Sequence, residues 1–181
     1  MENTVRNHIF FKENNNPIPY YGLNYIDDHN QEITQVVNLN TRNLPGIPTI
    51  ISGKIYTQEK KPVINAKIEI WHADDIGAYH TNGNLCFPVQ TTLSGYVLTD
   101  HAGNYKIKTI RPGIYGYRAR HFYYRISAKG HMTLETTIYF KNDPRIKIDE
   151  TASIAEDFRH IDFKNNNGCL EGIANIYLPK I

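Results

Sequence analysis

Short stretches in which apolar and polar residues alternate fill the chain from about residue 49 onward. Between residues 66 and 71 an apolar side chain returns at every second position, and the segment 105–109 repeats this alternation around two lysines. Such a period of two places the apolar side chains on one face of an extended strand, so each segment is predicted to be a strand with one buried face. The predicted strands cover residues 50–56, 66–71, 95–99, 105–109, 120–128, 133–140 and 173–178.

A single segment, 151–160, is predicted to be a helix. Acidic residues stand near its beginning and Arg159 and His160 at its end, which is the order that the helix dipole favours. Many short strands without helices between them are typical of an all-β fold, here an antiparallel β-sandwich. We therefore expect residues 49–181 to form this sandwich. Residues 1–48 are expected to form an irregular N-terminal arm that packs on the domain or on a second subunit.

Composition and charge narrow the class of function. The chain has 181 residues, of which 21% are charged, and its net charge is +2. Such a small and evenly spread charge does not favour a nucleic-acid-binding surface. No apolar run approaches the length that spans a bilayer, and the first residues lack the apolar segment of a signal peptide. The chain is therefore expected to be cytoplasmic, with no nucleic-acid or membrane partner.

Three stretches of the chain carry the residues that matter for chemistry. Residues 68–79 are IEIWHADDIGAY, residues 99–115 are TDHAGNYKIKTIRPGIY, and residues 118–123 are RARHFY, with the strand 134–140 and Asp143-Pro144 after them. Each stretch alone has an ordinary structural interpretation, because tyrosines fit the half-buried surface of a strand. The chain has 13 tyrosines against 7 phenylalanines, so the positions of the tyrosines have to be considered as metal ligands as well.

Taken in this order, the three stretches resemble the intradiol ring-cleavage dioxygenases, a family that includes the catechol and protocatechuate dioxygenases. The family pattern is a Trp-centred strand followed by Gly-x-Tyr, then Asp-x-x-Gly-x-Tyr, Thr-Ile-x-Pro-Gly-x-Tyr and Arg-x-x-His-x-His, and last a Tyr-Phe strand before Asp-Pro. The resemblance covers about residues 46–144, and several spaced matches in one order make it specific.

The resemblance implies an Fe(III) cofactor and the residues that hold it. Tyr79 matches the equatorial tyrosinate ligand, Tyr115 the axial tyrosinate, and His121 the first, equatorial histidine. Arg118 matches the arginine that steadies the substrate during attack by oxygen. Anionic oxygen ligands suit a hard trivalent cation, and a bound cation brings the pKa of a tyrosine far below its usual value of ~10.

The implied reaction opens a catechol-type ring between its two hydroxylated carbons with O2 and gives a muconate-type diacid. In the family the substrate displaces the axial tyrosinate, which takes up a proton, so the resemblance also makes Tyr115 catalytic. The expected partners are a small aromatic diol and O2. The N-terminal arm, in addition, offers a contact through which the chain forms a homo-oligomer.

The chain departs from the family pattern at three positions. Tyr123 stands where the family has its second, axial histidine, Thr137 replaces a glutamine, and Ser94 replaces an arginine. Residues 121 and 123 are two apart on a strand, so Tyr123 faces the same side as His121 and is a candidate fourth metal ligand. A phenol reaches further than an imidazole, however, and a third phenolate over-neutralises the iron once a catecholate arrives. Ligation by Tyr123 is therefore left open.

Three functions are compatible with this sequence. The first is an active dioxygenase with altered iron ligation. The second is a catalytically weak or inactive relative that binds a small molecule or a protein, and the third is a purely structural sandwich. The structural interpretation is the weakest, since folding alone does not require two tyrosines, an arginine and a histidine at these spacings. The residues therefore favour the dioxygenase.

Overall fold

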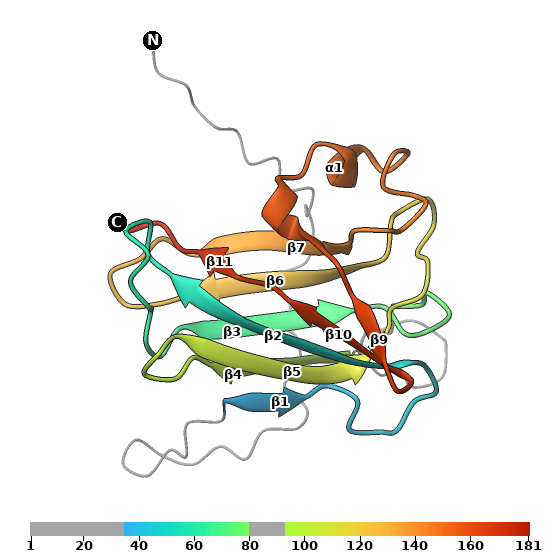
Figure 1. The fold of residues 1–181 in the computed structure, drawn as a ribbon, viewed down its shortest axis with the longest axis horizontal. Coiled ribbons are helices and arrows are strands. Elements are labelled where there is room, and N and C mark those ends of the chain that lie inside the picture. Colours follow the sequence, from blue (N-terminus) through green and yellow to red (C-terminus); the bar gives the residue numbers. More distant parts are fainter. Residues whose placement is uncertain (1–34, 80–92) are drawn as a thin grey trace, which may run out of the picture.

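The computed structural model describes residues 35–79 and 93–181, which form two β-sheets packed face to face (Figure 1). One sheet contains, in order, β1 (Val36–Asn38), β5 (Asn104–Ile110), β2 (Pro48–Tyr56), β10 (Cys169–Ile173) and β9 (Lys164–Asn166), with β11 (Ile176–Tyr177) also paired to β2. The other sheet contains β4 (Leu93–Leu98), β3 (Lys67–His72), β6 (His121–Ser127), β7 (Leu134–Phe140) and β8 (His160–Ile161). The predicted all-β sandwich is confirmed.

The centre of each sheet is antiparallel, and parallel pairs are added by the first strand and by the C-terminal strands. β2 pairs with β5, β3 with β4 and β6, and β6 with β7 in antiparallel fashion. In contrast, β1 runs parallel to β5, β10 and β11 run parallel to β2, and β8 runs parallel to β7. Parallel neighbours cannot be joined by a tight turn, so these pairs join strands that a longer connection separates.

The segment 151–160 is not one continuous helix, so the predicted length is wrong. α1 (Glu150–Ser153) has four residues and is capped by the side chain of Asp149. A separate 3-10 turn, η1, follows at Asp157–Arg159. Ala152 is the buried residue of α1, so this short helix packs through a single side chain.

The C-terminal segment forms two strands, β10 and β11, instead of the single strand predicted over 173–178. Between β10 and β11 the backbone of Ala174 lies so close to Gly53 that a Cβ on that glycine would lie 1.9 Å from the Ala174 carbonyl oxygen. The hairpin of β9 and β10 was not predicted, because β9 is short and exposed along its whole length. Its turn contains Asn167 and Gly168, both with positive φ.

The predicted arm, residues 1–48, is described only in part. Three of its residues form β1 against β5, and residues 1–34 lie outside the described residues. Within the two described ranges, no helix has the length and apolar character needed to cross a membrane.

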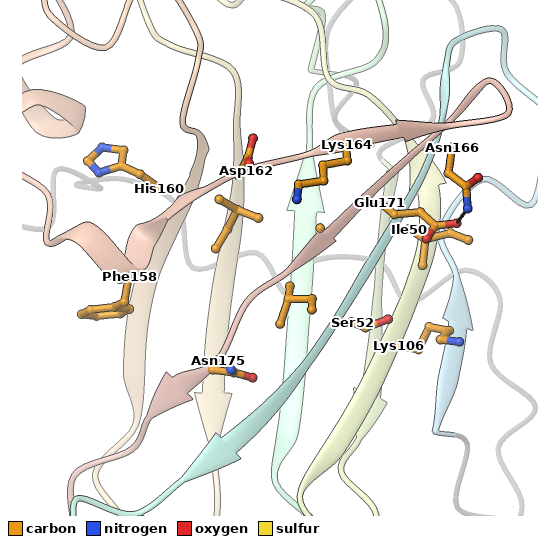
Figure 2. Close-up of a pocket in the computed structure, with 13 residues that line it drawn as sticks. Ile50, Ser52, Lys106, Phe158, His160, Asp162, Lys164, Asn166, Glu171 and Asn175 are labelled. Atoms are coloured by element: carbon orange, nitrogen blue, oxygen red, sulfur yellow. Dashed lines mark hydrogen bonds between the residues drawn. The ribbon is translucent and has the colours of Figure 1, made fainter.

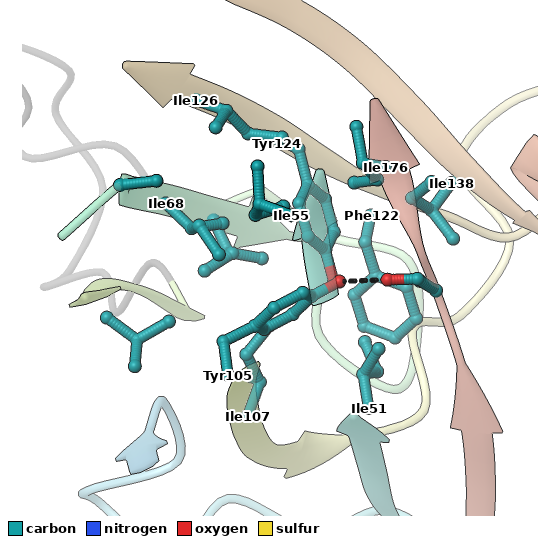
Figure 3. Packing of buried hydrophobic residues seen from close by; sticks show 14 of the residues in the cluster. Ile51, Ile55, Ile68, Tyr105, Ile107, Phe122, Tyr124, Ile126, Ile138 and Ile176 are labelled. Atoms are coloured by element: carbon teal, nitrogen blue, oxygen red, sulfur yellow. Dashed lines mark hydrogen bonds between the residues drawn. The ribbon is translucent and has the colours of Figure 1, made fainter. Parts of the chain in front are cut away.

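The core lies between the two sheets and is built by alternate side chains that face inward. Burial alternates along β2, as its period-two pattern predicts. Figure 3 shows Tyr105 of one sheet and Tyr124 of the other within this core, where the Tyr105 hydroxyl donates a hydrogen bond to the Ala174 carbonyl at 2.7 Å. Burial of an Ile or Phe side chain contributes about 1.5–3 kcal/mol. The largest fully buried side chains are Tyr124, Tyr139, Phe122, Ile51, Ile55, Ile68, Ile70, Ile107, Ile126, Ile138, Ile176 and Leu178.

His72 is a buried polar link between the two sheets. Its Nδ1 donates to the carbonyl of Ala73 at 2.6 Å, which leaves Nε2 to accept from the Thr109 hydroxyl of β5 at 2.6 Å. The imidazole also packs edge-on against Phe122, with ring centroids 4.9 Å apart. Burial lowers the pKa of His72 to about 4, so the ring is neutral in the folded protein at neutral pH.

Acid is expected to destabilise the metal-free fold through His72. Its pKa is about 4 when folded, against 6.5 for the ordinary value, so the unfolded chain binds the proton more tightly. The free energy of unfolding is therefore fully retained above pH 6.5 and falls as the pH drops toward 4, by at most about 3 kcal/mol from this group. Urea unfolding between pH 7 and 4.5 should show a shallower loss for His72→Gln than for the wild type. An equal loss in both proteins would contradict this, and His101→Gln on an exposed turn is the control.

Candidate metal centre

The proposed site lies on the outer face of the sheet that contains β6. Phe122, Tyr124 and Ile126 point from β6 into the core and are fully buried there. Side chains on a strand alternate between the two faces, so His121 and Tyr123 point the opposite way. Tyr79 reaches the same face from the loop after β3, and Tyr115 reaches it from the loop after β5.

His121 and Tyr79 are in direct contact at the site. The Tyr79 hydroxyl oxygen lies 3.1 Å from His121 Nε2. His121 Nδ1 lies 2.6 Å from the carbonyl oxygen of Ala119, so Nδ1 carries the hydrogen and Nε2 presents its lone pair toward Tyr79. Histidines that ligate a metal commonly hold their second nitrogen on a carbonyl in this way. Burial lowers the pKa of His121 to about 4, which keeps the imidazole neutral at physiological pH.

Tyr115 and Tyr123 complete a cluster of four donor side chains around this contact. The rings of Tyr79 and Tyr115 meet edge to face, with centroids 5.0 Å apart, and those of His121 and Tyr123 do the same at 4.7 Å. The rings of Tyr79 and Tyr123 are 6.4 Å apart. Tyr115 is 50% exposed, so the cluster opens to solvent on its side. The structure thus gathers the four predicted ligands in one place, and their role as ligands stays a prediction.

Two glycines bring the tyrosine-bearing loops together. Gly113 N donates to the Asp74 carbonyl at 2.7 Å, and a Cβ on Gly113 would lie 2.3 Å from the backbone nitrogen of Gly77. A Cβ on Gly77 would in turn lie 2.0 Å from the carbonyl oxygen of Ile114. Only glycine permits this approach of two backbones, and it fixes Tyr79 relative to Tyr115.

The loop before Tyr79 is shaped by one carboxylate. Asp74 Oδ1 accepts hydrogen bonds from the backbone nitrogens of Ile76 at 3.1 Å and Ala78 at 2.8 Å. The Asp74 backbone nitrogen donates to the Ala78 carbonyl at 2.9 Å, which closes the turn. Aspartate favours such turns because its short side chain bonds to backbone groups a few residues ahead. The strand β3 therefore ends in a compact turn that delivers Tyr79 to the site.

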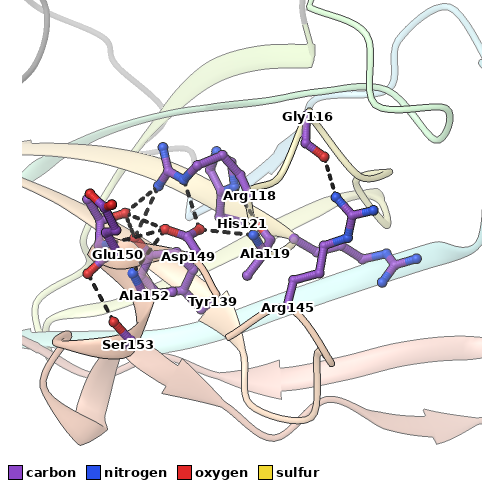
Figure 4. A network of polar contacts seen from close by, with 12 residues as sticks. Gly116, Arg118, Ala119, His121, Tyr139, Arg145, Asp149, Glu150, Ala152 and Ser153 are labelled. Carbon is purple, nitrogen blue, oxygen red and sulfur yellow. Dashed lines mark hydrogen bonds and ion pairs between the residues drawn. The ribbon is translucent and has the colours of Figure 1, made fainter. Parts of the chain in front are cut away.

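Arg118 is held at the edge of the cluster by the segment around α1 (Figure 4). Its Nε donates to Asp149 Oδ2 at 2.8 Å, and its Nη2 donates to the hydroxyls of Thr151 at 2.7 Å and Tyr139 at 3.3 Å. Burial acts to raise the pKa of Asp149, but hydrogen bonds from Arg118, Thr151 and Ala119 outweigh it and hold that pKa below its usual range. The result is a buried carboxylate paired with the predicted substrate-binding arginine.

The phenols of Tyr79 and Tyr123 are neutral in the absence of a cation. Burial raises the pKa of Tyr79, and it also raises the pKa of Tyr123, where the charge of Arg118 opposes it in part. The ring of Tyr123 stacks on Trp71, with centroids 5.4 Å apart and an angle of 18° between the planes. A bound metal ion is therefore needed to produce phenolates at Tyr79 and Tyr123. The stack on Trp71 restrains the ring of Tyr123.

The three departures from the family pattern are neighbours in space. Trp71 of β3 pairs with Ser94 of β4 on one side and with Tyr123 of β6 on the other, and Tyr123 pairs with Thr137 of β7. Cross-strand partners share a face of the sheet, so these side chains form one row beside the donor cluster. Sequence spacing could not reveal this row, because it depends on the registers of four strands.

Asp149 is the functional candidate that the sequence did not point out. In the sequence it stands just before the predicted helix, and its contact with Arg118 joins residues 31 positions apart in the chain. Among the described residues, no three His, Cys, Asp or Glu side chains lie close enough to share a metal ion.

A separate hollow of about 900 Å³ lies on the outer face of the other sheet (Figure 2). Lys106 of β5 and Lys164 of β9 border it, together with Glu171 of β10 and Asn175. None of the four donor side chains lines this hollow. It is therefore distinct from the candidate metal centre.

Comparison with known protein families matches residues 18–171, most of the chain, to the family described as Dioxygenase. Catechol 1,2-dioxygenase of Acinetobacter baylyi is 32% identical over 121 residues, which are 55% of this chain and 38% of that protein. Hydroxyquinol 1,2-dioxygenase of a Rhizobium species is 27% identical over 139 residues, which are 65% of this chain and 47% of that protein. The chain thus spans less than half the length of these two relatives.

A solved structure shares the fold over nearly its whole length. It is the dioxygenase domain of a dioxygenase and carbohydrate-binding fusion protein from Streptomyces sp. SirexAA-E, with a TM-score of 0.69 at 25% identity. The match covers 91% of this chain and 98% of that domain. Together with the family match, these likenesses show that the chain belongs to the intradiol ring-cleavage dioxygenase family.

Proposed function

We propose that this chain is a non-haem Fe(III) dioxygenase that opens a catechol-type ring between its two hydroxylated carbons and releases a muconate-type diacid. One observation carries the proposal. The Tyr79 hydroxyl and His121 Nε2 are 3.1 Å apart, while His121 Nδ1 is held on the Ala119 carbonyl. A phenol and an imidazole lone pair therefore face one point from a restrained geometry, as ligands of a metal must. Membership of the family supports the identity of the reaction.

The donor set fits Fe(III) better than a softer metal. Tyr79, Tyr115 and Tyr123 are hard oxygen donors, and a trivalent cation is the kind of charge that offsets phenolates. The neutral His121 is ready to ligate without first losing a proton near neutral pH. Burial disfavours free phenolates at Tyr79 and Tyr123, so a bound cation is what would offset their negative charge. We infer that Tyr79, Tyr115 and His121 hold the iron, with Tyr123 as a candidate fourth ligand.

When bound, Fe(III) supplies the Lewis acidity that makes a chelated catechol reactive toward O2. The chain's own residues then have separate tasks. Tyr115 is half exposed, so a substrate would reach its oxygen first, and that oxygen would take up a substrate proton. The Arg118 guanidinium, fixed by Asp149 and Thr151, steadies the negative charge that develops on the substrate. Trp71 keeps the ring of Tyr123 against the sheet.

The test is the iron content, colour and oxygen uptake of the purified protein. We expect bound iron at less than one equivalent per chain and a visible tyrosinate-to-Fe(III) charge-transfer band that disappears when iron is removed with a chelator. With catechol, hydroxyquinol or protocatechuate, the iron-loaded protein should consume O2 and form a ring-opened diacid. The rate should be low for the family, since the residues next to the donor cluster are altered.

The same experiment separates this function from a binding module. The row of Ser94, Tyr123 and Thr137 beside the cluster is the observation that favours weak or absent turnover. A fully iron-loaded sample that binds catechols in calorimetry but takes up no O2 with any of them would establish the binding module and refute the dioxygenase. A protein that takes up no iron at all would refute both the metal centre and the reaction.

A further inference from the structure

We propose that Asp149 is a positioning residue of this site, which sets Arg118 directly and His121 through Ala119. The inference rests on the proposed function and adds to it a residue that lies outside the family motif. Asp149 is completely buried and belongs to the segment after β7 (Figure 4). Its carboxylate accepts five hydrogen bonds, three on Oδ1 and two on Oδ2, and the two oxygens have separate roles.

The two oxygens of Asp149 have different partners. Oδ1 faces α1, where it accepts from the backbone nitrogens of Thr151 at 3.1 Å and Ala152 at 3.2 Å, and from the Thr151 hydroxyl at 2.8 Å. Oδ2 faces the site, where it accepts from Arg118 Nε at 2.8 Å and from the backbone nitrogen of Ala119 at 2.9 Å. One oxygen therefore caps the helix, and the other holds the chain that enters β6.

Ala119 connects Asp149 to the proposed ligand His121. Its backbone nitrogen is bound by Asp149 Oδ2, and its carbonyl oxygen accepts from His121 Nδ1 at 2.6 Å. Ala119 is fully buried, so its peptide groups have little freedom once these two bonds are made. A shift of Ala119 consequently moves the imidazole or changes which nitrogen carries its hydrogen. Both changes alter the direction in which Nε2 presents its lone pair.

The Thr151 hydroxyl gives Arg118 a second anchor on the same segment. It donates to Asp149 Oδ1 and accepts from Arg118 Nη2 at 2.7 Å. The guanidinium is thereby held through two of its nitrogens, which fixes its plane as well as its position. α1 contributes just one buried residue, Ala152, which packs with Ala119 and Tyr139. Delivery of Asp149 and Thr151 to Arg118 is the clearest role that this four-residue helix has in the structure.

The substitution Asp149→Asn separates the two roles of the carboxylate. Asparagine is a good helix cap, so its amide oxygen retains the bonds to α1. Its amide nitrogen then faces two N–H donors, those of Arg118 and Ala119, and cannot accept from either. We expect kcat per bound iron to fall about 10- to 100-fold, with a smaller change in KM, because Arg118 acts during the attack on the bound substrate. The tyrosinate-to-iron charge-transfer band should shift as well.

Asp100→Asn is the control. Asp100 is also buried, and its Oδ1 accepts from the backbone nitrogens of Ala102 at 2.8 Å and Asn104 at 2.7 Å in the turn between β4 and β5. Its loss should cost stability in urea unfolding without the selective loss of kcat. If both variants show the same kcat per iron and the same charge-transfer band, Asp149 is a structural residue and the inference is wrong.

The nitrogen resonances of His121 provide a measurement that does not depend on turnover. In metal-free protein, 15N spectra should show His121 with its hydrogen on Nδ1 in the wild type and in Asp100→Asn, and a changed ring pattern in Asp149→Asn. Should the wild type bind no iron or consume no O2, the proposed function fails, and these spectra still decide the inference. A wild-type pattern in Asp149→Asn would overturn it.

Discussion

Replacement of Gly113 by alanine is expected to lower the free energy of unfolding by about 3 kcal/mol and to remove most of the iron. The added Cβ would lie 2.3 Å from the Gly77 nitrogen and 2.4 Å from the Asp75 carbonyl oxygen. Both atoms belong to the backbone and cannot rotate away, so the two loops must separate. Separation moves Tyr115 away from Tyr79, whose rings are now 5.0 Å apart. Urea unfolding and iron stoichiometry measure the two effects.

Gly130→Ala is the control for this prediction. Gly130 lies in the turn between β6 and β7, and a Cβ there meets no atom within 4 Å. Its φ of +76° makes alanine strained, so a loss of about 1 kcal/mol is expected from the backbone alone. Iron content should stay at the wild-type level. A Gly113→Ala protein that matches Gly130→Ala in both measurements would show that the contact between the loops does not position the ligands.

The substitution Tyr123→His is expected to raise iron occupancy and to increase ring cleavage about tenfold. β6 already directs this side chain to the same face as His121, so no change of backbone is required. An imidazole is a neutral donor, whereas burial raises the pKa of Tyr123 and makes its phenolate costly to form. Iron stoichiometry and O2 uptake should be measured on both proteins side by side. A gain in neither quantity would mean that the lost histidine is not what limits the site.

Tyr123→Phe shows which role the tyrosine has at present. Phenylalanine retains the stack on Trp71 and removes only the hydroxyl. If Tyr123 is a working ligand, Tyr123→Phe loses iron and shifts the charge-transfer band, and Tyr123→His replaces one ligand by another. If the tyrosine only fills the space of an imidazole, Tyr123→Phe behaves like the wild type. Thr137, which pairs with Tyr123 on β7, remains unchanged in both variants. Any shortfall in iron occupancy or ring cleavage that remains in Tyr123→His is therefore attributed to Thr137.

The alternation of apolar residues was sufficient to predict the central strands, because their buried faces follow the period of two. The pattern could not reveal β9, because all of its residues are exposed and its sequence therefore shows no alternation of apolar and polar positions. It also could not show that β10 and β11 lie parallel to β2, since pairing between distant segments leaves no local signal. The helix predicted over 151–160 failed because capping and charge favour a start, while only packing sustains the length.

The order of motifs identified the donor residues that the fold gathers, including Tyr79 and His121. The sequence could not show which residues hold these donors in place. Asp149 looks like an ordinary helix cap in the sequence, and its second oxygen contacts Arg118 only because the segment after β7 folds back over β6. The row that joins Ser94 to Thr137 is likewise visible only once strand registers are known.

The parallel partners of β2 have a consequence for how this protein folds during its synthesis. β2 emerges from the ribosome long before β10 and β11, which complete its hydrogen bonding. Until those strands are made, the nascent chain carries a strand with an open edge, which invites association with other chains. Closure of this sheet must therefore wait until residues 169–177 have been synthesised.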